Sequence, residues 1–420
     1  MLKRRALTGP TMKVLLVHNY YRSGAPGGED VVFRQERDLL ESAGVRVITY
    51  TRSNDEVSER DPWAVAKAAV GMRWSRRTYR ELAELIRHER PDVAHFHNTF
   101  PLISASGYAA CQDQGVPVIQ TLHNYRIVCA AATFYRDGAS CELCQPGVPW
   151  PAVRHRCYRG SAAGSLAVAW MLWRNWTSGV YQRLVDRYIV LTRFAAARLE
   201  AAGVPAIRIL IKPNFVKANA QAGAGVGSYA VYAGLLSPEK GVRTLFDAWR
   251  ELRDVPLKVM GDGPLMSELA LRCREESLPI ELMGMRPRQE VLSIVAGARL
   301  QVVPSECYEG LPMAALEASA SGVPIIASRI GSLEELVVPE QTGLLFAPGN
   351  AHDLATQVRR LLSDAALQAR IRGATLERHL TAFSPERSLE VMLALYRELS
   401  SGPDAARPAT PHARARIGCP

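Results

Sequence analysis

The sequence predicts an α/β protein made of two doubly wound, parallel-sheet domains that face each other across a cleft. Short apolar strands alternate with helical segments from residue 12 to about residue 346. Such alternation is typical of parallel sheets wrapped by helices. Residues 213–228 are rich in Gly and Ala, poor in large apolar side chains, and predict a linker between two series of elements. A chain of 420 residues is long enough for two or three domains.

The first series of elements predicts an N-terminal Rossmann-like domain at residues 12–212. The apolar strand MKVLLVHNYY enters a glycine-containing loop, and VVFRQERDLLESAG then has helical spacing that ends at Gly44. A second strand is expected at residues 45–50, and further strands in DVAHFHN, VPVIQTLHN and DRYIVLT. The carboxyl ends of parallel strands form the edge at which doubly wound sheets bind ligands.

The second series predicts a C-terminal Rossmann-like domain at residues 229–383, and shorter segments flank the two domains. An amphipathic helix is expected at residues 384–400. Residues 401–420 have the composition of a disordered tail. Residues 1–11 form an N-terminal extension that carries three basic residues but lacks the apolar centre of a signal peptide.

Glu309 and Glu317 stand eight residues apart, in a turn and a helix that follow the apolar strand at residues 300–303. Free amides and the positive dipole end of this helix, near residues 310–313, favour a diphosphate. Carboxylates two turns apart are suited to accept hydrogen bonds from sugar hydroxyls. The arrangement points to a sugar-nucleotide site, although a solvated glutamate followed by a glutamate on a helix face explains the spacing alone equally well.

Over about residues 12–400 the chain resembles the retaining glycosyltransferases of family 4, also called group 1. Glu309 to Glu317 has their E-x7-E form, and EASASGVPIIAS continues their pattern. YAGLLSPEKGV, VMGDGPL and QTGLLF resemble three further motifs of the family, in the expected order. The resemblance implies the GT-B architecture, two Rossmann-like domains facing across a cleft, with the helix at residues 384–400 crossing back onto the first domain.

The resemblance also implies roles for individual residues, with retention of anomeric configuration and no divalent metal or other cofactor in catalysis. Lys240 would neutralise charge on the leaving diphosphate, Glu309 would orient the donor sugar, and His123 would hydrogen-bond the sugar or the developing charge. Glu317 would hold the ribose hydroxyls of a nucleotide-diphosphate sugar, with UDP or GDP as nucleotide. The expected donor-binding residues are Gly27, Gly28, Gly261, Asp262, Gly263, Gly310, Leu311, Pro312, Met313 and Glu317.

In the N-terminal half, a glycine loop and two histidines are further candidates for the cleft. Residues 24–28 could bring amides near a phosphate or simply make a tight connection, because they lack the full G-x-G-x-x-G spacing. His97 and His123 each end a predicted strand, and a solvated or capping histidine is the alternative for both. Asn124 stands where many relatives carry aspartate, which predicts a difference in sugar choice.

Four of the eight cysteines bracket a polar insertion with the spacing C-x11-C-x2-C-x12-C. Four thiolates at such spacing can close a tetrahedral, structural zinc site. Two disulfides, free thiols or an iron–sulfur cluster are the alternatives. The cysteines of the insertion at residues 129–157 are Cys129, Cys141, Cys144 and Cys157.

Positive charge is concentrated in the first half of the chain. Residues 1–205 hold 27 Lys and Arg against 18 Asp and Glu, and the whole chain has a net charge of +10. Basic side chains interleaved with Trp74 and with Trp170, Trp173 and Trp176 favour an anionic membrane surface, with an ordinary core helix as the alternative. No nucleic-acid motif accompanies the charge. We expect a cytoplasmic protein, peripheral on the inner face of the membrane, that acts on a glycan or lipid-linked acceptor in polysaccharide or cell-envelope synthesis.

Leu235 departs from the family pattern, which usually has arginine at this position before the lysine. Either another arginine supplies the cation, with Arg22, Arg243 and Arg286 as candidates, or activity is weakened. The alternatives to a glycosyltransferase are therefore a catalytically silent sugar-nucleotide-binding protein and, less favoured by the motifs, a sugar-nucleotide epimerase.

Overall fold

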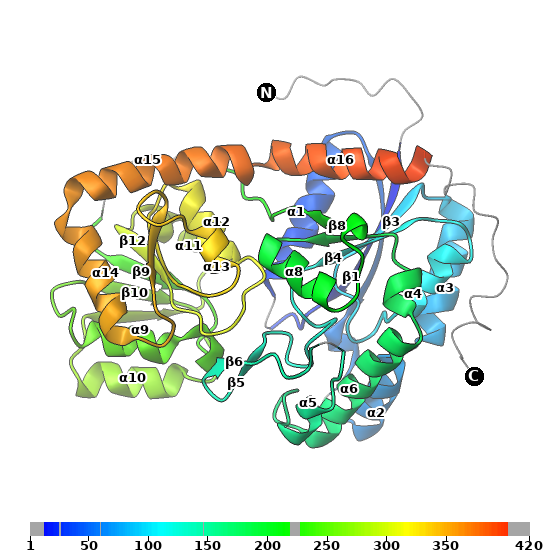
Figure 1. Ribbon diagram of the computed structural model, residues 1–420, viewed down its shortest axis with the longest axis horizontal. Coiled ribbons are helices and arrows are strands. Elements are labelled where there is room, and N and C mark those ends of the chain that lie inside the picture. The colour runs from blue at the N-terminus through cyan, green and yellow to red at the C-terminus, as the bar shows by residue number, and fades with distance from the viewer. Residues whose placement is uncertain (1–11, 25–26, 59, 146, 219–226, 402–420) are drawn as a thin grey trace.

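The computed structural model describes residues 12–24, 27–58, 60–145, 147–218 and 227–401. Two α/β domains lie side by side, and each has a six-stranded sheet at its centre (Figure 1). The strand orders are β2-β1-β3-β4-β7-β8 and β11-β10-β9-β12-β13-β14, and neighbouring strands pair in parallel. The predicted α/β class with two parallel-sheet domains is confirmed.

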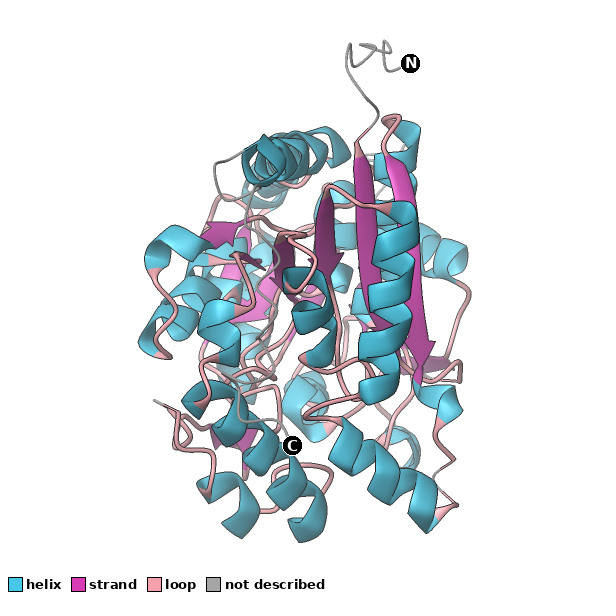
Figure 2. Cartoon of the chain, turned by 90° about the vertical axis from the view of Figure 1, so that its right-hand side faces the viewer, coloured by secondary structure: helices cyan, strands magenta, loops and turns pink. Residues whose placement is uncertain are grey.

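The N-terminal sheet has a strongly apolar centre, because its middle strands are covered by helices on both faces. Residues 14–17 of β1 are completely buried, as expected for a central parallel strand. Figure 2 shows these strands side by side with helices packed across them. The strands are β1 (Lys13–Tyr20), β2 (Arg46–Ser53), β3 (Val93–Phe96), β4 (Val118–Leu122), β7 (Arg187–Val190) and β8 (Ile209–Ile211), with a small hairpin of β5 (Tyr135–Arg136) and β6 (Ala139–Ser140).

Helices of the N-terminal domain start at identifiable caps. Ser75 accepts the Thr78 amide at the start of α3, and Ser161 accepts the Gly164 amide at the start of α6. The helices are α1 (Gly28–Ser42), α2 (Pro62–Gly71), α3 (Arg76–Glu89), α4 (Ser106–Gln112), α5 (Pro151–Arg154), α6 (Ala162–Thr177), α7 (Val180–Arg183) and α8 (Arg193–Ala201).

The C-terminal domain repeats the same design. Strand β12 has the predicted bounds. The apolar run at residues 323–327 also predicts a strand, but β13 begins two residues later, because Gly322, at a φ of +67°, and Pro324 complete the turn before it. The strands are β9 (Ala230–Ala233), β10 (Leu257–Met260), β11 (Ile280–Gly284), β12 (Leu300–Val303), β13 (Ile325–Ser328) and β14 (Gly343–Phe346). The helices are α9 (Val242–Trp249), α10 (Met266–Glu275), α11 (Arg288–Ala296), α12 (Met313–Ala320), α13 (Leu333–Leu336), α14 (Ala351–Ser363) and α15 (Ala365–Ala382).

The last helix, α16 (Pro385–Ser401), continues from α15 and lies over the N-terminal domain (Figure 1). Met392, Leu395 and Tyr396 are buried there in one cluster with Val14 and Val93 of the sheet. Helix α16 thus connects the C-terminal domain to the N-terminal domain. No helix in the described part is long and apolar enough to cross a membrane. The expectations for residues 1–11, for residues 219–226 of the linker and for the tail from residue 402 lie outside the described residues.

Candidate functional site

Glu309 and Lys240 form an ion pair at the carboxyl edge of the C-terminal sheet. Lys240 Nζ lies 2.7 and 2.9 Å from the two carboxylate oxygens of Glu309, and the Ser305 hydroxyl donates to the same carboxylate at 2.6 Å. Lys240 ends a 3₁₀ turn after β9, and Glu309 lies in the loop between β12 and α12. Burial lowers the pKa of Lys240 and the Glu309 carboxylate raises it, with a net upward shift. A fixed cation therefore stands at the mouth of the candidate site.

Glu317 lies in the second turn of α12 and is buried. Its Oε1 atom is 2.7 Å from the Arg288 guanidinium, yet no described residue gives this atom a well-directed hydrogen bond. Burial raises the pKa of Glu317, and Arg288 opposes that rise. Buried polar atoms normally have directed hydrogen bonds, so Oε1, which has only the ion pair with Arg288, can still accept a hydrogen bond from a ligand hydroxyl. Arg288 was missed by sequence reasoning, and only its place at a helix start after a proline-rich turn could have indicated it.

The glycines around Asp262 are required by contact between two loops. A Cβ on Gly261, at a φ of +137°, would lie 1.9 Å from the Gly234 carbonyl oxygen, and one on Gly263 would lie 2.5 Å from the Leu236 carbonyl oxygen. The Asp262 carboxylate accepts the Gly263 amide at 2.7 Å. The loops after β9 and β10 are stacked on each other, and this contact holds the turn that carries Lys240.

Two helix N-termini meet across the cleft between the domains. Gly27 is the N-cap of α1, and a Cβ on Gly28 would lie 3.6 Å from the Met313 side chain at the start of α12. Pro312 is the N-cap of α12. Each helix end carries partial positive charge and free amides. Their meeting makes this part of the cleft favourable for an anion such as a diphosphate.

The loop that carries Glu309 is pressed against the N-terminal domain. A Cβ on Gly310 would lie only 2.3 Å from the His123 carbonyl oxygen. The Tyr125 hydroxyl donates to the Glu309 carbonyl at 2.9 Å, and Leu311 is buried beside these contacts. Residues 123 and 309–313 are therefore brought together from opposite domains, as a cleft between two sheets requires.

His123 is held by a row of buried polar side chains. Its Nε2 lies 3.0 Å from His97 Nδ1, and His97 Nε2 lies 3.5 Å from the Glu36 carboxylate. The buried Nδ1 of His123 has no partner among the described residues. Burial lowers the pKa of both histidines, so they are neutral near pH 7. The row fixes the ring of His123 and leaves one nitrogen available for a ligand.

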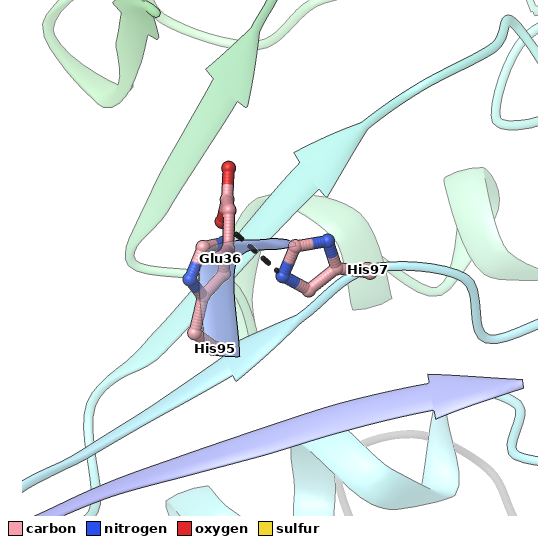
Figure 3. Close-up of side chains that lie close together, drawn as sticks. All are labelled: Glu36, His95 and His97. Carbon is pink, nitrogen blue, oxygen red and sulfur yellow. Dashed lines mark ion pairs between the residues drawn. The ribbon is translucent and has the colours of Figure 1, made fainter. Parts of the chain in front are cut away.

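Glu36, His95 and His97 come close enough to hold a metal ion, with candidate ligand atoms within 4.8 Å of one another (Figure 3). Both His95 nitrogens are already engaged, at 2.7 Å each, by the Tyr396 and Thr121 hydroxyls. The Lys212 ammonium lies 2.6 Å from Glu36 and neutralises it. These partners make the cluster a hydrogen-bonded link between α1, β3 and α16.

Glu29 is a further buried carboxyl at the cleft that sequence reasoning missed. The Tyr21 hydroxyl and the Asn124 amide donate to the same Glu29 oxygen, at 2.5 and 3.1 Å. Burial raises the pKa of Glu29. Glu29, His97 and His123 line one small pocket of about 70 Å³. The Gly-Gly-Glu-Asp segment indicated a turn, but it did not indicate that this turn places the Glu29 carboxyl in the same pocket as His123.

The four cysteines of the insertion gather at one place as free thiols. Burial raises the pKa of Cys144 to about 12, with further contributions from the neighbouring thiols of Cys129, Cys157 and Cys141. No three of these sulfur atoms are mutually within 4.8 Å, since the described residues provide such a group only at Glu36. All-thiol donors suit zinc, so structural zinc at these cysteines stays a prediction.

The same insertion also contacts the loop before Glu309. The Glu142 carboxylate accepts the Tyr308 hydroxyl at 2.7 Å and pairs with Arg198 at 2.5 Å. The Tyr308 and Phe194 rings pack edge to face at 4.6 Å. The cysteine-rich insertion thus supports the residue adjacent to the candidate catalytic glutamate.

Leu235 is 51% exposed in the loop after β9, where the family pattern has a cation. Arg243 is bound to Glu268 at 2.7 Å, and Arg286 lies 3.6 Å from Glu290. Arg22 donates to the Val57 carbonyl in the N-terminal domain. The three sequence candidates are thus engaged elsewhere, whereas Arg288 lies 2.7 Å from the site residue Glu317.

Two family models match the chain, one in each half. The model of Glycosyltransferase Family 4 matches residues 26–219, and the model of Glycosyl transferases group 1 matches residues 227–364. The fold and cleft define a two-domain α/β protein of the GT-B class. Since the two models together extend over most of its length, the chain belongs to this glycosyltransferase family.

Curated relatives agree with this assignment. An uncharacterized glycosyltransferase of Methanocaldococcus jannaschii is 32% identical over 174 residues, which are 41% of this chain and 49% of that protein. The 2-deoxystreptamine glucosyltransferase of Streptomyces kanamyceticus is 27% identical over 300 residues, 70% of this chain and 74% of that protein. The chain spans less than half the length of the first relatives it matches, including 36% of the glycogen synthase of Mycobacterium tuberculosis.

Solved structures share the fold. Sucrose-phosphate synthase from Thermosynechococcus elongatus superposes with a TM-score of 0.69 at 21% identity, over 93% of this chain and 99% of that chain. Anabaena HepE in complex with UDP-glucose gives a TM-score of 0.62 at 18% identity, over 91% and 99%. The expected GT-B architecture is confirmed.

Proposed function

We propose that this protein is a retaining glycosyltransferase that moves a sugar from a nucleoside-diphosphate sugar to a glycan or lipid-linked acceptor in glycan biosynthesis. The observation that carries the proposal is the meeting of two helix N-termini at Gly28 and Met313, with Lys240 and Glu309 beside them. That combination binds a diphosphate and stabilises the charge it gains on leaving. HepE, which shares the fold, was solved with UDP and with UDP-glucose, and this supports UDP as the nucleotide, with GDP next.

In the proposed reaction, the acceptor hydroxyl oxygen bonds to the anomeric carbon while the bond from that carbon to the diphosphate breaks. The hydroxyl proton passes to the leaving phosphate oxygen on the same face, which retains the configuration. Lys240 stabilises the negative charge without a divalent metal. Glu309 orients the sugar, His123 donates or accepts at it through the free Nδ1, and Glu317 binds the ribose.

Calorimetric titration with UDP, GDP and ADP, without added metal, tests this proposal. We expect one nucleotide to bind in the micromolar range and a Glu317→Ala variant to lose that binding. An Arg243→Ala variant, which removes an exposed cation of the same domain, serves as the control and should bind as the wild type does. Absence of binding by all three nucleotides would contradict the proposal.

The exposed Leu235 supports a second candidate, a catalytically silent sugar-nucleotide-binding protein. This loop position offers no charge to a diphosphate, and Arg243 and Arg286 pair with carboxylates instead. A Leu235→Arg variant separates the candidates when donor breakdown and transfer are measured with a panel of acceptors. A large gain in turnover would support a wild-type site that is impaired by Leu235. Unchanged turnover, in an enzyme that is already active, would support another cation in place of the missing arginine.

A further inference from the structure

A buried ion pair in the N-terminal domain takes no part in the reaction described above. The Lys212 ammonium lies 2.6 Å from Glu36 Oε1 and 3.1 Å from the Ser388 hydroxyl oxygen. Glu36 is completely buried and Lys212 is 2% exposed. Burying two charges costs several kcal/mol per ion, and their mutual attraction returns this free energy only where the geometry is good. Apolar side chains could fill the same space between α1, β8 and α16, so the two charges call for a further role.

The second oxygen of Glu36 lies beside the row of buried histidines. Glu36 Oε2 is 3.5 Å from His97 Nε2, and both atoms are buried without a hydrogen bond from a described residue. Figure 3 shows the Glu36 carboxylate beside the His97 ring. A carboxylate oxygen carries only lone pairs, so it would repel a lone pair on Nε2 and attracts a hydrogen there. The contact therefore places the ring hydrogen of His97 on Nε2.

The position of that hydrogen determines the tautomer of His123. Burial lowers the pKa of His97 and of His123 well below the ordinary value, so near pH 7 each ring is neutral and carries one hydrogen. With its hydrogen on Nε2, His97 has a lone pair on Nδ1. His97 Nδ1 lies 3.0 Å from His123 Nε2, so His123 Nε2 donates in this hydrogen bond. His123 Nδ1 is then left with a lone pair and no hydrogen.

His123 Nδ1 is therefore a buried acceptor. No described residue donates to it, and His123 lines the pocket of about 70 Å³ at the cleft. A hydroxyl of the donor sugar can supply the missing hydrogen. A carboxylate or carbonyl oxygen at the same place would face the lone pair of Nδ1, so a sugar that carries such a group there is disfavoured.

We propose that Glu36 is a positioning residue that acts through His97 and fixes the tautomer in which His123 Nδ1 accepts a hydrogen bond from a hydroxyl of the donor sugar. Lys212 holds the Glu36 carboxylate in place, and Ser388 of α16 holds Lys212. This inference rests on the proposed function and deepens it, because it specifies that the sugar group at His123 is a hydrogen-bond donor.

Glu36→Gln should reverse the tautomer. The Lys212 ammonium can only donate, so it keeps the amide oxygen on its own side and leaves the amide nitrogen toward His97. His97 Nε2 would then accept, His97 Nδ1 would donate to His123 Nε2, and His123 Nδ1 would carry the hydrogen. Glu41→Gln, the same substitution at an exposed position of α1, is the matched control.

Nuclear magnetic resonance of the whole chain with ¹⁵N-labelled histidine measures the tautomer, because a ring nitrogen with a lone pair and one with a hydrogen differ strongly in ¹⁵N shift. A His123→Asn variant assigns the His123 signals by their loss. We expect Nδ1 of His123 without hydrogen in wild type and in Glu41→Gln, and with hydrogen in Glu36→Gln. A hydrogen on Nδ1 in wild type, or His123 shifts in Glu36→Gln that equal those of wild type, would overturn the proposal.

A double variant keeps the test decisive if Glu36→Gln does not fold. Removing one partner of a buried ion pair is strongly destabilising, whereas replacing both partners by apolar side chains is often tolerated. Glu36→Leu combined with Lys212→Met removes both charges. We expect His123 to populate both tautomers in this variant, because no charge at residue 36 then fixes the hydrogen of His97. Retention of the wild-type tautomer alone would overturn the role of Glu36.

Binding of UDP-glucose and of its deoxyfluoro analogues tests the consequence for the sugar. Each analogue carries fluorine in place of one hydroxyl, and fluorine cannot donate a hydrogen bond. We expect one analogue to bind wild type and Glu41→Gln about 10-fold more weakly than UDP-glucose, and this difference to fall to about twofold in Glu36→Gln. The same difference in wild type and Glu36→Gln for every analogue would overturn the sugar contact. If UDP-glucose does not bind at all, the proposed donor is wrong, while the histidine spectra still decide the role of Glu36.

Discussion

Individual polar atoms at the cleft lack the partners that buried atoms normally have. His123 Nδ1 is buried without a hydrogen bond from a described residue, and the buried Glu317 Oε1 has only its ion pair with Arg288 at 2.7 Å. Leaving such a group unpaired costs about 1–3 kcal/mol. The two atoms come from opposite domains but from helices and strands that open into the same cleft. A ligand that hydrogen-bonds His123 Nδ1 would recover this free energy.

Lys240 is the residue on which transfer should depend most. A Lys240→Ala substitution is expected to remove about 2 to 4 kcal/mol of transition-state stabilisation, by analogy with loss of one preorganised donor. This corresponds to a fall in kcat of roughly 30- to 1000-fold. Steady-state kinetics with the donor found by titration measure the effect. Arg243→Ala removes an exposed cation on the neighbouring helix and should stay within about twofold of wild type. Near-normal turnover of Lys240→Ala would exclude the proposed role.

Gly310 is predicted to be irreplaceable because of a contact between domains. An added methyl group would lie 2.3 Å from the His123 carbonyl oxygen, so Gly310→Ala must push the Glu309 loop away from the N-terminal domain. We expect loss of most transfer activity, measured as kcat/KM. Gly373→Ala is the matched substitution, since nothing lies within 4 Å of a Cβ there in α15. It should leave activity intact and raise the free energy of unfolding by up to about 1 kcal/mol. Equal activity of the two variants would refute the steric argument.

The sequence predicted local features of single residues better than their contacts. Glu309 and Glu317 were singled out by their spacing across a turn and a helix after a strand, and Lys240 was indicated by the resemblance to the family. The pairing of Glu317 with Arg288 joins two helices, and no spacing rule connects them. The row from Glu36 through His97 to His123 likewise depends on sheet register and on how α1 packs against β3.

At the scale of elements, apolar runs and turn residues predicted strands well. Strand β12 has the expected bounds because an apolar run ends at a proline-rich turn. The shift of β13 shows the limit, since Pro324 has no amide to donate and the turn set by Gly322 extends through it. The stacking of the loops after β9 and β10 could not be predicted, because it needs the strand order of the finished sheet.

Helix α16 is joined to the N-terminal sheet through His95, and this contact should be sensitive to pH. Burial lowers the pKa of His95 to about 4, whereas in the unfolded chain the pKa is about 6.5. The unfolded state therefore binds the proton first, and stability present above pH 6.5 is lost as the pH falls toward 4. This histidine alone accounts for about 1 kcal/mol between pH 7.5 and 5.5.

Urea unfolding at pH 7.5 and 5.5 measures this dependence. A His95→Gln variant keeps a donor and an acceptor but cannot titrate, so its loss of stability on acidification should be about 1 kcal/mol smaller than that of wild type. His88→Gln changes a histidine of α3 whose side chain is 83% exposed, and it should retain the wild-type dependence. If wild type and His95→Gln lose the same free energy of unfolding between pH 7.5 and 5.5, His95 does not couple folding to proton binding.

Structural zinc in the insertion remains our proposal. A tetrahedral site needs Zn–S distances of about 2.3 Å, which would draw the four sulfur atoms closer than they lie here. We expect about one zinc per chain by elemental analysis and a lower melting temperature after chelation. Cys144→Ser should lose the metal, whereas Cys273→Ser, in α10 of the other domain, should keep it. If the purified protein contains no zinc and a chelator does not change its melting temperature, the zinc site is excluded.

At the scale of the whole molecule, charge and exposed apolar surface are both concentrated in the N-terminal domain. The first 205 residues carry 27 basic against 18 acidic side chains, and α2 and α6 present exposed tryptophans. The C-terminal domain, which forms the proposed donor site, is joined to this surface through the interdomain contacts and α16. Such a division lets one domain lie on an anionic membrane while the other takes a water-soluble donor from solution.

Flotation with anionic vesicles tests that orientation. Bound protein should float with the vesicles at low salt and be released at about 1 M NaCl, because the Debye length then falls to about 3 Å. Trp63→Ala removes a side chain that is 85% exposed on α2 and should reduce the floated fraction several-fold. Ile207→Ala removes an 81% exposed apolar side chain outside α2 and α6 and serves as the control. Wild-type protein that stays in the soluble fraction at low salt would contradict membrane binding. An equal reduction of the floated fraction in Trp63→Ala and Ile207→Ala would contradict binding through the surface of α2 and α6, because the exposed tryptophan would then contribute nothing specific.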